Sequence, residues 1–177
     1  MTILTTIILG AILGMLLSPS HSDAFLAKHS PQATGGSVTP RLSVDPRGSI
    51  YLIWKEERES QAGHIFFNRS TDRGQSWQQD ARGLDGTKPN GSRSSSPRVD
   101  SDGKGNVYAA WWTKHRDGTK DVLVSTSRDF GASFGPAVKL NRDYGAFPPE
   151  INADGKGHVY VVWSDERTDD EEGSRRG

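Results

Sequence analysis

One sequence unit occurs three times in this chain, and it restricts the possible folds more than any other feature. The copies begin at Pro40, Pro97 and Pro149 and read PRLSVDPRGSIYLIW, PRVDSDGKGNVYAAW and PEINADGKGHVYVVW. Each copy carries Asp, Gly, Tyr and Trp at the same four offsets, and the copies begin 57 and then 52 residues apart. A period of this size is typical of folds in which one supersecondary unit is copied in tandem.

Each unit predicts four short strands. We expect them over residues 42–45, 49–54 and 64–69 with a weak fourth after Trp77, and in the second unit over 98–100, 106–112, 121–127 and 134–140. Segments such as SDGKGN predict tight hairpin turns, because glycine adopts positive φ at little cost. Units of about 50 residues with four strands are typical of β-propeller blades, so the expected class is all-β.

An octet recurs between the third and fourth expected strands of the first two units. Its residues are Ser70, Asp72, Gly74 and Trp77 in the first copy, and Ser127, Asp129, Gly131 and Phe134 in the second. We predict a structural role, since an aspartate can accept backbone N–H bonds across a turn and glycine can supply a left-handed position. The aromatic ring at the end can pack between neighbouring sheets. A turn motif explains both aspartates without a catalytic role.

The octet and the VYxxW strand resemble the Asp-box, or bacterial neuraminidase repeat (BNR), of sialidases and related six-bladed propellers. The resemblance covers about residues 37–167 and implies a sialidase-like β-propeller fragment, with blade 1 at 37–96, blade 2 at 97–148 and a partial blade 3 with a charged tail at 149–177. Because propellers need four to eight blades to close, we expect a truncated gene product in preference to a piece completed by assembly. The motif predicts the fold more strongly than it predicts an enzymatic activity, because Asp-boxes also occur in non-catalytic propellers.

Binding residues are expected on the face opposite the octets, where the loops vary in length. Sialidases hold the carboxylate of an acidic sugar with three arginines, a role that suits the bidentate guanidinium. The resemblance makes Arg41 and Arg98 candidates, because both would begin an innermost strand, but the third unit has Glu150 there. The full set of substrate-binding candidates is Arg41, Arg98, Arg58, Arg116 and Tyr144. The alternative is that these arginines bind no ligand and lie at the rim of the central channel or on the surface.

No catalytic residue can be assigned from the sequence. The resemblance to sialidases implies a tyrosine nucleophile partnered by an acid, which is an exception among glycosidases. Tyr51, Tyr108 and Tyr160 fall on the repeat and are therefore expected to pack, while the acidic loop residues are expected to lie on the surface. Tyr144 lies outside the repeat, on the candidate face.

Composition excludes several function classes. The formal net charge is zero and no Lys/Arg-rich run occurs, so nothing supports a nucleic-acid partner. The chain has no cysteine, and its five histidines show no paired ligand spacing, so neither a metal site nor a cofactor is indicated. The segment DSDGKGN lacks the oxygen ligands of a calcium loop, because Lys104 and Trp111 occupy the fifth and twelfth positions.

The first 22 residues contain no charged side chain, and residues 3–17 are almost entirely apolar. This length suits the core of a signal peptide better than a membrane span, which needs about 20 apolar residues. We therefore expect residues 1–22 to be a signal peptide or an N-terminal anchor and 23–36 to be a linker. The chain would be secreted, periplasmic or at the cell surface, touching a membrane only through 1–22 if uncleaved.

Three functions remain open at this point. The first is an exported Asp-box propeller that interacts with glycans or glycoconjugates without complete catalytic machinery. The second is an exo-α-sialidase, a glycoside hydrolase, or a fragment of one. The third is a structural or protein-interaction propeller.

Overall fold

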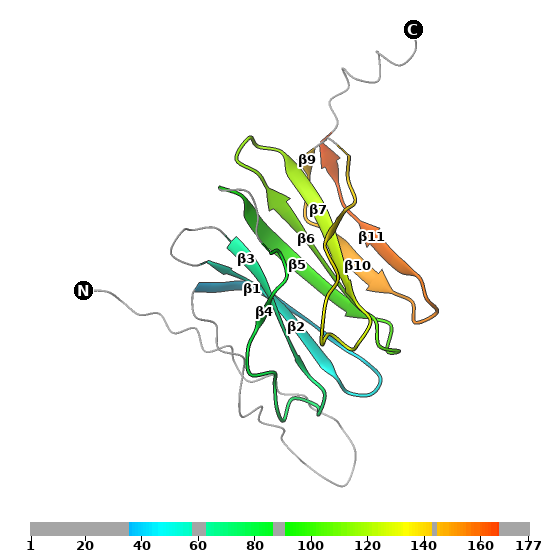
Figure 1. Cartoon of the computed structure of the whole chain (residues 1–177). Helices are drawn as coiled ribbons and strands as arrows, with labels where there is room; N and C mark the ends of the chain where they lie inside the picture. Colours follow the sequence, from blue (N-terminus) through cyan, green and yellow to red (C-terminus); the bar gives the residue numbers. More distant parts are fainter. Residues whose placement is uncertain (1–35, 58–62, 87–90, 143–144, 167–177) are drawn as a thin grey trace, which may run out of the picture.

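The computed structural model describes residues 36–57, 63–86, 91–142 and 145–166, which fold into antiparallel sheets (Figure 1). The first sheet has the order β1 (Gly36–Val44), β2 (Ile50–Glu57), β3 (Gly63–Ser70) and β4 (Arg82–Gly83). The second has β5 (Arg93–Ser101), β6 (Val107–Lys114), β7 (Lys120–Ser127) and β8 (Val138–Lys139) in the same order. Two short sheets follow, β10 (Glu150–Ala153) with β11 (Val159–Val162), and β9 (Gly145–Ala146) with β12 (Asp165–Glu166).

The predicted fold class is confirmed. Both complete sheets have four antiparallel strands in sequence order, as a propeller blade requires, and the third unit supplies a smaller sheet of the same design. Among the described residues, no helix is long and apolar enough to cross a membrane. The fourth strands are only two residues each: β4 agrees with the weak strand signal after Trp77, whereas β8 is much shorter than the strand predicted over 134–140.

The innermost strands are longer than predicted. We expected the first strand of the second unit at 98–100, whereas β5 begins at Arg93. The sequence RSSSP gives no strand signal, but Ser94 is buried and its Oγ lies 2.9 Å from Thr113 Oγ1 on β6. Hydroxyl pairs of this kind let polar residues lie inside a sheet.

A bulge divides each innermost strand just before its Pro-Arg pair. The register shifts between Val38 and Arg41 and again between Ser95 and Arg98. Thr39 has φ 55° and Ser96 has φ 49°, a left-handed conformation that costs about 1–2 kcal/mol outside glycine. The third unit has Pro148 there, and the proline ring holds φ near −65°. The third unit accordingly has two separate strands, β9 and β10.

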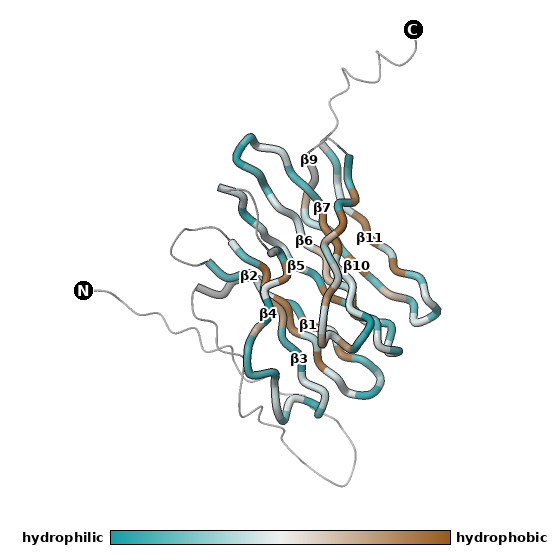
Figure 2. Tube along the Cα trace, in the orientation of Figure 1, coloured by the Kyte–Doolittle hydropathy of each residue, from teal (hydrophilic) through white to brown (hydrophobic). Residues whose placement is uncertain are grey.

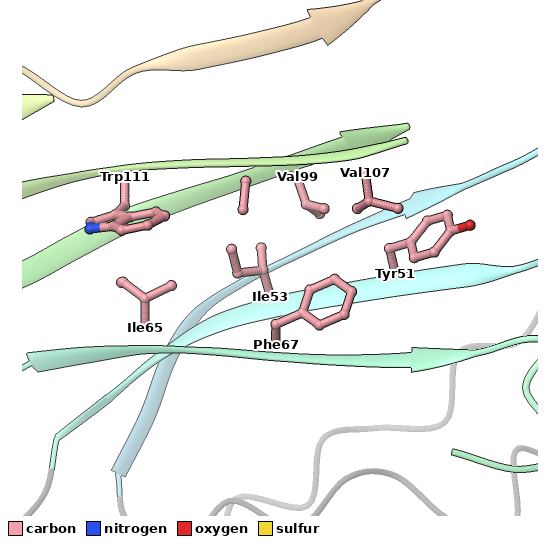
Figure 3. Packing of buried hydrophobic residues seen from close by; sticks show 8 residues of the cluster. Tyr51, Ile53, Ile65, Phe67, Val99, Val107 and Trp111 are labelled. Carbon is pink, nitrogen blue, oxygen red and sulfur yellow. The ribbon is translucent and has the colours of Figure 1, made fainter. Parts of the chain in front are cut away.

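The core lies between the first two sheets (Figure 3). From the first sheet it takes Tyr51, Ile53, Ile65 and Phe67, and from the second it takes Val99, Val107, Ala109 and Trp111. Figure 2 shows hydrophobic segments along these strands and hydrophilic turns at their ends. Alternate residues of each strand thus face the neighbouring blade, since side chains alternate across a sheet.

The tyrosines of the repeat divide into two groups. Tyr51 and Tyr108 are buried, as predicted for packing residues. Tyr160 is exposed, which contradicts its predicted packing role, because no described sheet covers that face of β11. The leader 1–22, most of the linker 23–36, Arg58, Tyr144 and the charged tail from 167 onward lie outside the described residues.

Candidate functional site

Both octets form the same hydrogen-bonded turn. In the first, Ser70 Oγ accepts from Gly74 N at 2.8 Å and donates to Asp72 Oδ1 at 2.7 Å. Asp72 Oδ1 accepts from Ser76 N at 2.9 Å, and Asp72 Oδ2 accepts from Ser76 Oγ. Gly74 has φ 87°, so the predicted left-handed glycine is confirmed, and the preceding Arg73 also has positive φ, at 60°. The aspartate therefore closes the turn, as the sequence indicated.

The second octet repeats this geometry at Ser127, Asp129, Gly131 and Ser133. Hydrogen bonds from Ser76 and Ser70 lower the pKa of Asp72 to about 2, and those from Ser133 and Ser127 do the same for Asp129. A carboxylate already saturated by its own turn is a poor proton donor at neutral pH. Both aspartates are therefore structural.

The aromatic residue of the second octet joins two sheets, as predicted. The Phe134 ring lies edge-on to Phe67 of β3, with 4.8 Å between ring centroids. Arg69 of β3 adds to this contact by donating to the carbonyls of Asp129 and Phe130 at 3.0 and 2.6 Å. Trp77 is half-buried, and its indole Nε1 has no hydrogen-bond partner among the described residues. The second octet thus holds the first two blades together on one face of the molecule.

The predicted binding residues of the inner strands lie on adjacent strands. β1 lies beside β5, and β5 lies beside β10. Arg41, Arg98 and Glu150 each follow the proline that opens their repeat. Arg41 and Arg98 were expected to begin their strands, but β1 and β5 start at Gly36 and Arg93, so both arginines lie inside the strand.

Two of these three side chains form an ion pair with each other. Arg98 Nη2 donates to Glu150 Oε1 at 2.6 Å, between positions that are equivalent in the repeat. This bond and the charges of Arg98 and Arg41 lower the pKa of Glu150. Nη1 of Arg41 and of Arg98 each donates to the carbonyl of its preceding proline, at 2.8 and 3.0 Å. We call Arg41, Arg98 and Glu150 the inner row, a set of two guanidiniums and one carboxylate.

Arg116 does not join the inner row. It is exposed in the turn between β6 and β7, whereas Arg98 pairs with Ala110, four residues before the end of β6. At about 3.4 Å per residue, the backbone of Arg98 is about 14 Å from that end. The structure therefore places the two arginines at different levels of the same blade, while Arg58 and Tyr144 lie outside the described residues.

A polar cluster that the sequence did not indicate lies at the β6–β7 turn. His115 Nδ1 is 3.0 Å from Ser92 Oγ, and His115 Nε2 is 3.0 Å from Asp121 Oδ2. Burial opposes the ionised form of Asp121, but the bonds from Lys139 and His115 outweigh it and lower its pKa. Ser92 is buried, so its oxygen is not accessible to a substrate. The cluster stabilises the turn that carries Arg116. The only sequence signal that could have indicated this cluster is the short spacing of His115 and Asp121 across a hairpin.

Metal binding finds no support in the described part of the chain, where no group of three His, Asp or Glu side chains could hold an ion. The repeat aspartates are bound to their own turns. Asp102 Oδ1, for example, accepts from Lys104 N at 2.8 Å and from Asn106 N at 3.0 Å. The hairpin explanation of DSDGKGN is therefore confirmed.

Comparisons with known proteins find likeness in structure alone. No family model matches the chain, and no curated protein sequence does. The Hadza microbial sialidase Hz136 superposes with a TM-score of 0.48 at 18% identity, over 58% of this chain and 25% of the sialidase chain. An alpha-L-arabinanase of Penicillium chrysogenum, complexed with arabinobiose, superposes with a TM-score of 0.47 at 22% identity, over 78% of this chain and 44% of its own. This chain therefore spans less than half the length of either protein, and the likeness to both is partial.

Proposed function

We propose that this chain is an exported Asp-box propeller that binds glycans and lacks complete catalytic machinery. The observation that carries the proposal is the inner row. Arg41, Arg98 and Glu150 occupy one repeat position on three adjacent strands, and the two arginines follow bulges with left-handed, non-glycine residues. Bulges and strained backbone are common where a protein re-aims a side chain for binding.

The inner row suits binding by hydrogen bonds to sugar hydroxyls. The guanidinium of Arg41 is exposed, and it presents several N–H donors in a fixed plane. Arg98 is held by the carboxylate of Glu150, which also offers acceptors because it is exposed. The row therefore combines donors and acceptors in one place, as recognition of a polyhydroxylated ligand requires.

Hydrolysis is less well supported. A tyrosine nucleophile needs an accessible hydroxyl near an acid. Tyr51 is buried, its Oη donates to Asp45 Oδ2 at 3.0 Å, and burial raises its pKa to about 12. Tyr108 is also buried, and Tyr160 lies on the far face of the third sheet, away from the second. None of these three tyrosines combines exposure with a place in the inner row.

Calorimetric titration with neutral and acidic oligosaccharides tests the proposal. Binding that falls at least tenfold on Arg41→Ala, but not on Arg128→Ala, supports it. Arg128 is a matched control because it is exposed on the octet face, at the opposite end of the blade. Failure of every oligosaccharide to bind would refute the proposal.

Two further assays separate the alternatives. Release of a fluorophore from a sialoside substrate, lost on Arg41→Ala, would favour an exo-α-sialidase. Capture of one protein partner without any affinity for sugars would favour a protein-interaction propeller.

A further inference from the structure

The carboxylate of Asp100 on β5 joins the innermost strands of three sheets. Its Oδ1 accepts from Ser43 Oγ of β1 at 2.9 Å, and its Oδ2 accepts from the backbone N of Ala153 on β10 at 2.7 Å. The partners lie 57 and 53 residues away along the chain. Because β1, β5 and β10 belong to three different sheets, no backbone ladder connects them. Side-chain bonds such as these therefore help to determine how far apart the three strands lie.

These bonds lie directly beside the inner row. Asp100 follows Arg98 by two residues, and Ser43 follows Arg41 by two residues. Alternate residues of a strand point to the same face and lie about 7 Å apart. Arg98 and Asp100 thus reach the third unit side by side, one through the carboxylate of Glu150 and the other through the backbone of β10.

An aspartate suits this position better than the side chains that replace it in the other units. Ser43, Asp100 and Asn152 occupy the same offset of the repeat. A serine or an asparagine side chain has one acceptor oxygen, whereas an ionised carboxylate has two and can accept from both neighbours at once. Ala153 also needs an acceptor, because β10 pairs only with β11 among the described strands and its other edge is unpaired.

We propose that Asp100 is a positioning residue for the inner row. It sets the spacing of β1, β5 and β10, and thereby the separation of the donors and acceptors carried by Arg41, Arg98 and Glu150. This inference rests on the proposed function, since it assigns binding to the inner row. Binding groups need to be held within about 0.5 Å of their productive places, and a site that is about 1 Å too loose binds poorly. Asp100 acts through the inner row and does not itself contact the glycan.

Pulsed EPR distances test the spacing without any glycan. The full chain has no cysteine, so nitroxides can be attached at Lys104→Cys and Lys156→Cys. Both lysines are exposed in the hairpin turns that follow β5 and β10. We expect Asp100→Ala to broaden the distribution of distances between these labels. Asp100→Asn should restore the narrow distribution, because asparagine keeps an acceptor for Ala153 N and its NH2 group can donate to Ser43 Oγ.

A label pair within the second sheet is the matched control. Lys104→Cys and Arg128→Cys both lie on the octet face of this sheet, and both side chains are exposed. Asp100→Ala should leave the distances of this pair unchanged, because the hydrogen bonds that it removes join different sheets. An unchanged distribution between positions 104 and 156, or equal broadening of both pairs, would overturn the proposal.

Calorimetry with the neutral and acidic oligosaccharides then tests the effect on binding. We expect Asp100→Ala to lower the affinity about tenfold, and Asp100→Asn to stay within about threefold of the unsubstituted chain. Asp102→Ala separates positioning from stability. Asp102 accepts from Lys104 N and Asn106 N within its own hairpin, so its loss should lower the urea midpoint of unfolding without lowering the affinity.

The two proposals fail in different ways. If no oligosaccharide binds the unsubstituted chain, the proposed function is refuted, and the EPR distances alone decide whether Asp100 sets the spacing. If an oligosaccharide binds but Asp100→Ala leaves its affinity unchanged, the proposed function stands and the positioning role is overturned. An equal loss of affinity in Asp102→Ala would overturn it too, because the effect would then follow from lower stability.

Discussion

Gly131 of the second octet meets two separate demands, and its replacement by alanine should reveal both. Its φ is 82°, in the left-handed region. A Cβ added there would lie 2.7 Å from Cζ and 3.0 Å from Cε1 of Phe67. Phe67 cannot move aside easily, because it is fully buried and its ring packs edge-on to Phe134. The substitution therefore adds overpacking to backbone strain.

The magnitude follows from adding these two contributions. A non-glycine residue in the left-handed region costs about 1–2 kcal/mol. Overpacking a well-packed core costs about 1–3 kcal/mol more. We expect Gly131→Ala to lower the free energy of unfolding by about 2–5 kcal/mol. At about 2–4 °C per kcal/mol for a chain of this size, the melting temperature should fall by roughly 4–20 °C.

Two other glycines isolate the backbone contribution. Gly74 is the equivalent in the first octet, with φ 87°, and its added Cβ would meet Ile50 Cδ1 at an ordinary 3.4 Å. Gly118 has φ 92° and nothing within 4 Å of such a Cβ. Alanine at either position should cost only about 1–2 kcal/mol. Urea unfolding followed by tryptophan fluorescence measures all three, and an equal loss at Gly131 and Gly118 would refute the packing argument.

Three other predictions concern single side chains. In the folded chain, the pKa values of Asp72 and Asp129 are lowered from 3.8 to about 2. The stability that these two carboxylates contribute is therefore complete above pH 3.8 and is lost as the pH falls towards 2. Asp129→Asn should make the urea midpoint of unfolding fall less steeply over this pH range. Trp111→Ala should cost about 3–5 kcal/mol in the same assay, and Trp111→Phe clearly less, because Trp111 is fully buried and its Nε1 has no partner among the described residues. Glu150→Gln removes the carboxylate that pairs with Arg98, and it should therefore raise the affinity for an acidic oligosaccharide, measured by calorimetry, about tenfold. An unchanged affinity would contradict the proposed role of the inner row.

Local features were predictable from the sequence because the residues that create them are close along the chain. The octet turn depends on bonds between positions two and four residues apart, such as Asp129 with Ser127 and Ser133. The hairpins of the repeat depend on an aspartate that accepts from residues two and four positions later, as Asp45 does. Three copies of one pattern then indicate three copies of one sheet, since each copy faces the same local preferences.

The limits of strands were less predictable, because burial and pairing decide them. The serines before Pro97 lack an apolar pattern, and β5 includes them because the neighbouring strand supplies hydroxyl partners. The exposure of Tyr160 also could not be read from the repeat, because Tyr51, Tyr108 and Tyr160 occupy the same offset. Their surroundings differ only in whether another sheet lies against them.

The sequence alone determined the class of fold, the position of the turns and the role of the octet aspartates. Only the tertiary structure decided which side chains meet between blades. Arg98 bonds to Glu150 across 52 residues, and Ser92 lies against His115 across 23. Such contacts depend on how whole sheets stack. Stacking is determined by the summed burial of many apolar side chains, and no single sequence motif encodes that sum.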